Sequence, residues 1–501
     1  MRYLFLLSRL AQRRIALPKP LDCPPGCHYM STWPDQAPST WRESVAITAR
    51  TVKYMCRETF GKWPIGDIAF GIKYHMKHLH QDTIQQDYAG QGSLQLKGDE
   101  TVSELMYLLN YLRLCFYYSK RPFPEFLQYG GYCQENVLIQ NSKAQLLRPA
   151  FTIVCDEKSR SFLIIIRGAT SARDRLTAAT SGEVPFRHIN IQKGGVVNFV
   201  KGYAHCGMVA AAHWIAKYAV PCLTKARNQF PDYQIKVMGH SMGAGVAAIL
   251  THILRERKEF ASSTCLAFAP AACMTWDLAE SGKEFITSLI NRNDVVPSFS
   301  KVSADDLRSE VIGSSWLHDV VGPTPLNKLF KATNQHMAFL QSCLVFMSSS
   351  RQEVRDDADI ALCPQPIISE AAISSRTSSL STTVEERLQI SSSFRNPIRE
   401  FSSLSITSSE KRPTNFTPKR PIKLNSDPSS KEHKQLFPPG RIIHMVSLPD
   451  LASKESIRVF ENPRSLYAKM RLAPDMIRDH YMPSYIEMLE LLIEDLTNKK
   501  E

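Results

Sequence analysis

Val237-Met238-Gly239-His240-Ser241-Met242-Gly243-Ala244-Gly245 decides how this 501-residue chain folds. An apolar run precedes the stretch, and a run of small and apolar residues at 246–254 follows it. This order predicts a strand, a sharp turn and a helix, which is the setting of a G-x-S-x-G nucleophile elbow. Gly239 and Gly243 suit the turn because a Cβ at either position would collide with neighbouring backbone. The stretch therefore predicts an α/β fold that presents Ser241 at the edge of a sheet.

The five-residue pattern alone is weak evidence, because a glycine-rich connection whose serine merely caps the next helix has the same letters. A catalytic serine needs a histidine to take its proton, and that histidine needs a carboxylate to orient it. In α/β-hydrolases the acid follows the serine in the chain, and the histidine follows the acid. We therefore expect both partners on the C-terminal side of Ser241.

Asp294 is the best-placed acid. It lies just past an apolar run at 285–290 that is typical of a buried strand. Loops that follow the strands of an α/β sheet gather at the edge where ligands bind. Three other acids have no strand pattern directly before them: Asp277, Asp305 and Asp306. We expect Asp294 to be the acid, and the alternative is a surface turn residue.

Five histidines after Ser241 are candidate bases: His318, His336, His433, His444 and His480. His480 lies beyond the last expected strand and directly before a helix expected at 484–496, where the loop of the base belongs. His444 lies inside a strand expected at 442–446, where a packed core histidine is the usual outcome. The pattern favours His480, and His444 stays the alternative.

An oxyanion hole needs two backbone N–H donors. The amide of Met242, directly after the nucleophile, is one candidate. The second belongs to a loop after an earlier strand, and Arg167-Gly168-Ala169-Thr170-Ser171 follows a strand expected at 162–166. An ordinary glycine turn is the alternative reading of that loop.

Composition and pattern divide the chain into four segments. We expect an irregular basic tail at 1–40, a helical extension with the main part of an α/β-hydrolase domain at 41–347, a Ser-rich disordered insertion at 348–435, and the rest of the domain at 436–501. The insertion cannot bury enough apolar surface to offset its ordering entropy. Strands alternate with helices on both sides of it, which predicts one α/β-hydrolase sheet with a helical N-terminal extension and a long insertion before the last strand.

The net charge of +13 favours attraction to anionic surfaces. The sequence has no pattern of a nucleic-acid-binding module, so we expect an anionic membrane surface, and no nucleic acid, as partner. No apolar run approaches the roughly 18 residues that span a bilayer. Twelve scattered cysteines predict buried free thiols in a reducing compartment, without a metal site. We expect a cytoplasmic protein with peripheral membrane contact, and the basic N-terminus leaves organelle targeting open.

Five blocks of the sequence resemble the class 3 lipase family, nearest to its diacylglycerol-lipase-like branch. In chain order they are Ile166-Arg167-Gly168 with Asp174-Arg175-Leu176-Thr177, Ala204-His205-Cys206-Gly207-Met208, the elbow itself, Asn291-Arg292-Asn293-Asp294-Val295-Val296-Pro297, and Pro438-Pro439-Gly440-Arg441-Ile442-Ile443-His444 with Asp479-His480-Tyr481-Met482-Pro483. The resemblance covers about residues 100–345 and 436–496.

The resemblance implies a serine lipase that hydrolyses acylglycerol or phospholipid esters through an acyl-enzyme, without metal or organic cofactor. It assigns Ser241 as nucleophile, Asp294 as acid and His480 as base. It places the oxyanion donors on the backbone of Ala169 and Met242. The family usually has threonine where this chain has Ala169, so any contribution of that hydroxyl is lost here.

Two alternative functions stay open: a soluble esterase for small esters, and a catalytically impaired lipid-binding or scaffold protein on the same fold.

The resemblance also implies that 171–200 forms part of a lid over the site. In the 374–409 part of the insertion, Ser379 and Ser402 each follow an arginine by three positions, a pattern that predicts a basophilic kinase as partner.

Overall fold

The structure is a computed structural model that describes residues 33–55, 71–78, 81–90, 92–191, 197–314, 367–368, 434–449 and 455–498. The insertion expected at 348–435 lies outside these ranges except for residues 367, 368, 434 and 435. The tail before residue 33 and the expected kinase sites at 374–409 also lie outside them, so these expectations stay predictions.

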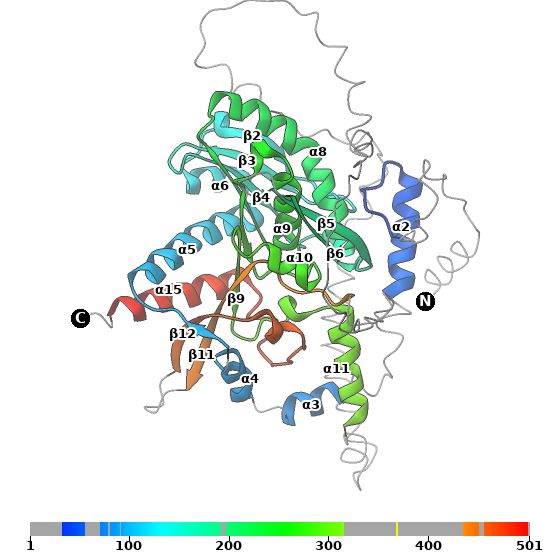
Figure 1. Cartoon of the computed structure of the whole chain (residues 1–501), viewed down its shortest axis with the longest axis vertical. Coiled ribbons are helices and arrows are strands. Elements are labelled where there is room, and N and C mark those ends of the chain that lie inside the picture. Colours follow the sequence, from blue (N-terminus) through cyan, green and yellow to red (C-terminus); the bar gives the residue numbers. More distant parts are fainter. Residues whose placement is uncertain are drawn as a thin grey trace, which may run out of the picture. The chain divides into compact units, whose positions relative to one another are not determined.

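A mixed sheet of ten strands runs through the described residues, in the order β1-β12-β11-β9-β8-β7-β4-β3-β2-β10 (Figure 1). The strands are β1 (Leu94–Gln95), β2 (Val137–Asn141), β3 (Phe151–Asp156), β4 (Ser161–Ile166), β7 (Gln234–His240), β8 (Thr264–Phe268), β9 (Ile286–Asn291), β10 (Ile367–Ile368), β11 (Arg441–Pro449) and β12 (Glu455–Glu461). The central strands β4, β7, β8, β9 and β11 are parallel, and antiparallel strands extend both edges. The carboxyl ends of the parallel strands therefore meet along one edge.

Helices cover both faces of this sheet. Side chains of β4 alternate between two cores: Ile164 and Ile166 pack with α8 and α9, whereas Leu163 and Ile165 pack with α5 and α15. The helices are α2 (Trp41–Tyr54), α3 (Ile72–His78), α4 (Gln81–Tyr88), α5 (Asp99–Lys120), α6 (Phe123–Gly130), α7 (Ala172–Ala179), α8 (Cys206–Gln229), α9 (Met242–Arg255), α10 (Trp276–Ser281), α11 (Lys301–Gly313) and α15 (Met482–Asn498). Both faces of the central strands are buried, which explains their continuous apolar runs.

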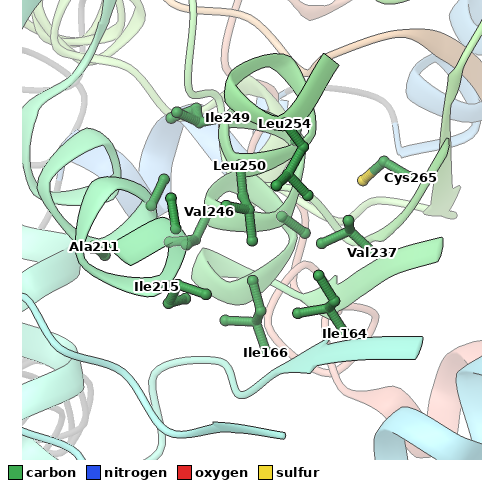
Figure 2. Close-up of a cluster of buried hydrophobic side chains, with 14 of the residues drawn as sticks. Ile164, Ile166, Ala211, Ile215, Val237, Val246, Ile249, Leu250, Leu254 and Cys265 are labelled. Carbon is green, nitrogen blue, oxygen red and sulfur yellow. The ribbon is translucent and has the colours of Figure 1, made fainter. Parts of the chain in front are cut away.

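The core under α9 shows what holds the elbow in place. Figure 2 shows Val246, Leu250 and Leu254 of this helix next to Ile164 and Val237 of the sheet, and all of them are fully buried. Burial of each such side chain contributes roughly 1.5–3 kcal/mol. The helix that begins at the elbow is therefore anchored along its length, not only at its N-terminus.

The structure confirms the expected α/β-hydrolase architecture, with two additions. The strands β5 (Glu183–Ile191) and β6 (Val197–His205) form a separate antiparallel hairpin, where no strand was expected. Pro185 and Gly202 interrupt its strand pattern, and the hairpin instead depends on packing against α9 and α10. The strand β12 follows β11, so β11 is the last parallel strand of the sheet rather than its last strand.

Candidate active site

Ser241 lies in a strained turn between β7 and α9. Its backbone has φ 60° and ψ −127°, a conformation that costs a non-glycine residue roughly 1–3 kcal/mol. A Cβ on Gly239 would lie 2.6 Å from the backbone of Gly243, and one on Gly243 would lie 2.5 Å from the carbonyl oxygen of Ile166. Glycine is therefore required at both positions, because the helix, the turn and β4 touch through their main chains.

Strained residues also follow the next two parallel strands. Ala269 after β8 has φ 48°, and Arg292 after β9 has φ 42°. Together with Ser241, they give three neighbouring strands that each end in a left-handed, non-glycine residue. Such strain persists only where the surrounding structure holds it, and it gathers at functional sites. We therefore expect a functional site at the carboxyl edge of the sheet.

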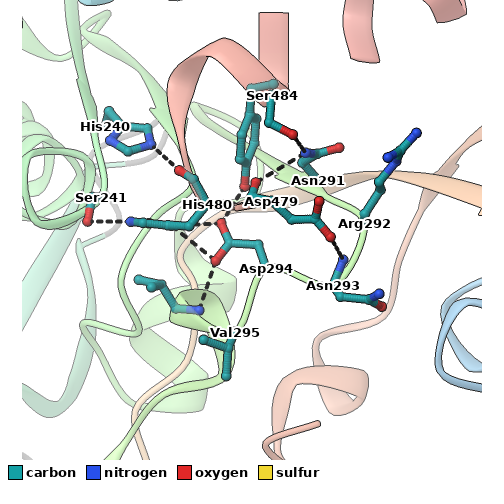
Figure 3. Close-up of polar contacts among 12 residues, drawn as sticks. His240, Ser241, Asn291, Arg292, Asn293, Asp294, Val295, Asp479, His480 and Ser484 are labelled. Atoms are coloured by element: carbon teal, nitrogen blue, oxygen red, sulfur yellow. Dashed lines mark hydrogen bonds and ion pairs between the residues drawn. The ribbon is translucent and has the colours of Figure 1, made fainter. Parts of the chain in front are cut away.

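His480 joins Ser241 to Asp294 at this edge (Figure 3). Its Nε2 lies 2.9 Å from the Ser241 hydroxyl, and its Nδ1 lies 3.0 and 2.9 Å from the two carboxylate oxygens of Asp294. A carboxylate can only accept, so Nδ1 carries the ring proton and Nε2 accepts from the serine. Three residues that are far apart in the chain thus form a continuous hydrogen-bonded line of serine, histidine and aspartate.

The Asp294 carboxylate is fully buried yet ionised. It accepts hydrogen bonds from the Tyr485 hydroxyl at 2.6 Å and from the backbone N–H of Val296 at 2.9 Å. Burial pushes the pKa of Asp294 upward, but His480, Tyr485 and the Val296 amide outweigh burial and bring it below its ordinary value. The negative charge opposite His480 is therefore present at neutral pH.

The loops that carry His480 and Asp294 are also hydrogen-bonded to each other beyond this line. The backbone carbonyl of Asp479 accepts from the Asn291 amide at 3.1 Å, and its carboxylate accepts from the Asn293 N–H at 3.2 Å. On the other side, the ring of His240 donates from Nε2 to the carbonyl of His480 at 2.8 Å. Burial lowers the pKa of His240 to about 3, so this ring is a neutral donor and not a competing base.

The loop expected to complete the oxyanion hole lies against the elbow. A Cβ on Gly168 would be 2.7 Å from the carbonyl oxygen of His240 and 3.6 Å from the Cβ of Ser241. Ala169 follows directly, and a capping box formed by Ser171 and Asp174 begins α7. Met242 is the first residue of α9, so its amide is at the positive end of that helix. One proposed donor thus belongs to the loop after β4, and the other to the first turn of α9.

The other sequence candidates lie elsewhere. His444 is buried on β11, where it bonds to Tyr467 and to the carbonyl of Arg292. Asp277 is in α10, and Asp305 and Asp306 are in α11. Three further histidine candidates lie outside the described residues: His318, His336 and His433.

Tyr485 and His240 also belong to this site, although the sequence did not predict a role for either. Neither carried a signal, because a tyrosine in an amphipathic helix and a histidine in a glycine-rich turn have many ordinary explanations. Within the ranges that the structure describes, no cluster of three His, Cys, Asp or Glu side chains is arranged to hold a metal ion. Over the same ranges, every helix is too short or too polar to cross a membrane.

Two family models match parts of this chain. The model described as "Lipase (class 3)" matches residues 163–303, and "Lipase 3 N-terminal region" matches residues 30–95. These two parts of the chain are similar to the class 3 lipase family. The class 3 lipase match includes Ser241 and Asp294, whereas His480 lies beyond it.

Part of the chain is also similar to diacylglycerol lipases. The mouse beta enzyme is 32% identical over 165 residues, which cover 32% of this chain and 23% of that protein. The human alpha enzyme is 28% identical over 170 residues, which cover 32% of this chain and 16% of that protein. The chain thus matches less than a quarter of the length of either relative.

Two fungal crystal structures are also similar to the chain. MDLA from Penicillium cyclopium has 19% identity and a TM-score of 0.32 over 39% of this chain and 74% of its own. The triacylglyceride lipase of Rhizomucor miehei has 17% identity and a TM-score of 0.31 over 40% of this chain and 75% of its own.

Proposed function

We propose that this protein is a serine lipase that hydrolyses acylglycerol esters, diacylglycerol foremost, through an acyl-enzyme. The observation that carries the proposal is the hydrogen-bonded line from Ser241 through His480 to Asp294. The similarity to diacylglycerol lipases supports the substrate class. We further propose that residues 41–347 and 436–501 belong to one catalytic domain, because the elbow and the base come from opposite sides of the insertion.

In the proposed reaction, the Ser241 oxygen attacks the ester carbonyl while Nε2 of His480 takes the hydroxyl proton. Collapse of the tetrahedral intermediate breaks the ester bond, and His480 gives the proton to the leaving alcohol. Water then attacks the acyl-serine, again activated by His480, and releases the fatty acid. Asp294 stays ionised throughout, because its hydrogen bonds offset its burial.

The oxyanion is proposed to bind the backbone amides of Ala169 and Met242. The close approach of Gly168 to Ser241 supports this assignment. Each such donor contributes a factor of about 10²–10³ to kcat in acyl-transfer enzymes. Because Ala169 has no hydroxyl, the site relies on main-chain donors there.

We propose that the protein works in peripheral contact with an anionic membrane surface, where phospholipid esters are a second candidate substrate. Three large apolar side chains near the triad in sequence are solvent-exposed: Phe299 at 52%, Ile477 at 47% and Tyr481 at 57%. A contiguous exposed apolar patch is typical of surfaces that meet lipid, and we propose that these side chains contribute to one. The net charge of +13 supports attraction to anionic head groups.

Ser241→Ala tests the proposal. We expect diacylglycerol hydrolysis in mixed micelles to fall by a factor of about 10³ or more, with an unchanged circular dichroism spectrum. Ser309→Ala, a change on the outer surface of α11, is the matched control and keeps full activity. Full turnover in Ser241→Ala, or a wild-type protein that a fluorophosphonate probe does not label, contradicts the proposal. Faster turnover of dispersed short-chain esters than of diacylglycerol supports the small-ester alternative instead.

A further inference from the structure

His444 occupies a buried polar cluster next to the loop that carries Asp294. Its Nε2 lies 2.8 Å from the carbonyl oxygen of Arg292, and its Nδ1 lies 2.8 Å from the Tyr467 hydroxyl. A carbonyl oxygen can only accept, so Nε2 carries the ring proton and Nδ1 accepts from the tyrosine. Burial lowers the pKa of His444 to about 4, so this ring is neutral and keeps this tautomer at neutral pH.

The carbonyl that His444 binds belongs to the strained residue of the acid loop. Arg292 has φ 42° and stands two positions before Asp294. Its N–H donates to the carbonyl of Met445 at 2.8 Å, while its own carbonyl accepts from His444. Adjacent residues of β11 thus hold both backbone polar groups of Arg292, one through the main chain and one through a side chain.

The rest of the loop is held by other elements. The amide of Gln85 in α4 donates to the Asn293 side chain at 3.1 Å, and Asp479 accepts from the Asn293 N–H. The Tyr88 ring, also from α4, packs on the His444 ring with centroids 4.2 Å apart. The Tyr88 ring therefore restricts rotation of the His444 ring, whose one N–H donates to the Arg292 carbonyl.

We propose that His444 is a positioning residue for Asp294. Its hydrogen bond holds Arg292 in the left-handed conformation, and that turn places the Asp294 carboxylate against His480. His444 does not touch the reacting atoms, and it acts through the loop. The inference rests on the proposed function, because it assigns a role relative to the proposed acid and base.

Two substitutions at this position separate positioning from packing. His444→Leu keeps the volume but removes the donor, whereas His444→Gln keeps an amide N–H near the place of Nε2. We expect kcat on diacylglycerol to fall about 100-fold in His444→Leu with KM unchanged, because a misplacement of about 1 Å costs roughly that factor. We expect His444→Gln to recover to within about tenfold of wild type.

The pH profile of kcat/KM also tests the proposal, because a purely structural role of His444 would not change it. A displaced Asp294 carboxylate stabilises protonated His480 less. The acid limb of the profile, which is the decline of kcat/KM at low pH, should therefore move to lower pH in His444→Leu. His252→Leu is the matched control, since His252 is also fully buried and its Nε2 binds a backbone carbonyl, that of Leu278, at 3.3 Å. This control should lower the melting temperature without moving kcat or the acid limb.

Tyr467→Phe tests the positioning role of His444 if His444→Leu does not fold. This change removes the hydroxyl that selects the tautomer and leaves Nδ1 to the weaker Asn462 contact at 3.4 Å. We expect kcat to fall about threefold to tenfold, with the same movement of the acid limb. The size is smaller because the bond to Arg292 survives in part.

The outcomes distinguish the two proposals. If Ser241→Ala or His480→Ala keeps its turnover, the proposed function is wrong. The positioning role is wrong if both of these variants lose turnover while folded His444→Leu has wild-type kcat and an unmoved acid limb. If His444→Leu does not fold, the same result in folded Tyr467→Phe overturns it. A His444→Gln variant as inactive as a folded His444→Leu also overturns it, because the retained donor should rescue the loop.

Discussion

Tyr485→Phe removes one hydrogen bond from the buried Asp294 carboxylate and little else. The hydroxyl lies 2.6 Å from the carboxylate oxygen, and both side chains are fully buried, so water does not replace the lost donor. A hydrogen bond to a charged group contributes about 1.5–3 kcal/mol, and we expect the free energy of unfolding at pH 7 to fall by that amount. We expect kcat/KM to fall about tenfold, which corresponds to about 1.4 kcal/mol of transition-state stabilisation.

The loss of stability should depend on pH in a defined direction. Because the folded-state pKa of Asp294 is below its ordinary value of 3.8, the charged carboxylate stabilises the fold above that pH. That contribution is lost as the pH falls through the folded-state pKa. The difference between wild type and Tyr485→Phe should therefore be largest at neutral pH and should shrink below about pH 4.

Urea unfolding followed by tryptophan fluorescence between pH 7 and pH 3.5 measures this difference. Tyr118→Phe is the matched control, since the buried Tyr118 hydroxyl has no hydrogen-bond partner among the described residues. Removal of an unpaired hydroxyl should be close to neutral. If Tyr485→Phe costs no more than Tyr118→Phe, or if its cost is independent of pH, the reasoning about the buried carboxylate is wrong.

Two further predictions concern the elbow and the loop of the base. Gly243→Ala puts a Cβ 2.5 Å from the Ile166 carbonyl oxygen. We therefore expect the free energy of unfolding, measured in urea, to fall by at least about 2 kcal/mol, and little activity to remain. Gly313→Ala is the control and should be neutral, because a Cβ there meets no atom within 4 Å. Burial raises the pKa of Asp479 to about 6, so wild-type stability should decline as the pH rises from about 4 to about 6. Asp479→Asn keeps the acceptor for Asn293 and should remove that decline; an unchanged slope would show that Asp479 is not the group responsible.

Local patterns were sufficient to predict the elements on either side of Ser241. The apolar run before Gly239 and the small residues after Gly243 specify a strand and a helix joined by a turn, and the structure has them as β7 and α9. Such signals are visible because a parallel strand buried on both faces requires a short continuous apolar run, and the buried helix that follows requires small and apolar residues over a longer stretch. The β5–β6 hairpin has no clear pattern of this kind, because its packing against α9 and α10, and not its own composition, stabilises it.

The site itself depended on the tertiary structure. The amino-acid sequence by itself named Ser241, Asp294 and His480 and left His444 as a rival, because position along the chain does not say which ring reaches the serine. Parallel pairing of β9 with β11 and the docking of α15 decide this: His480 reaches Ser241 across 239 positions, while His444 turns to the acid loop. Contacts over such separations follow from strand order and packing, which no local periodicity encodes. For the same reason, the donor from Tyr485 to Asp294 is visible only in three dimensions.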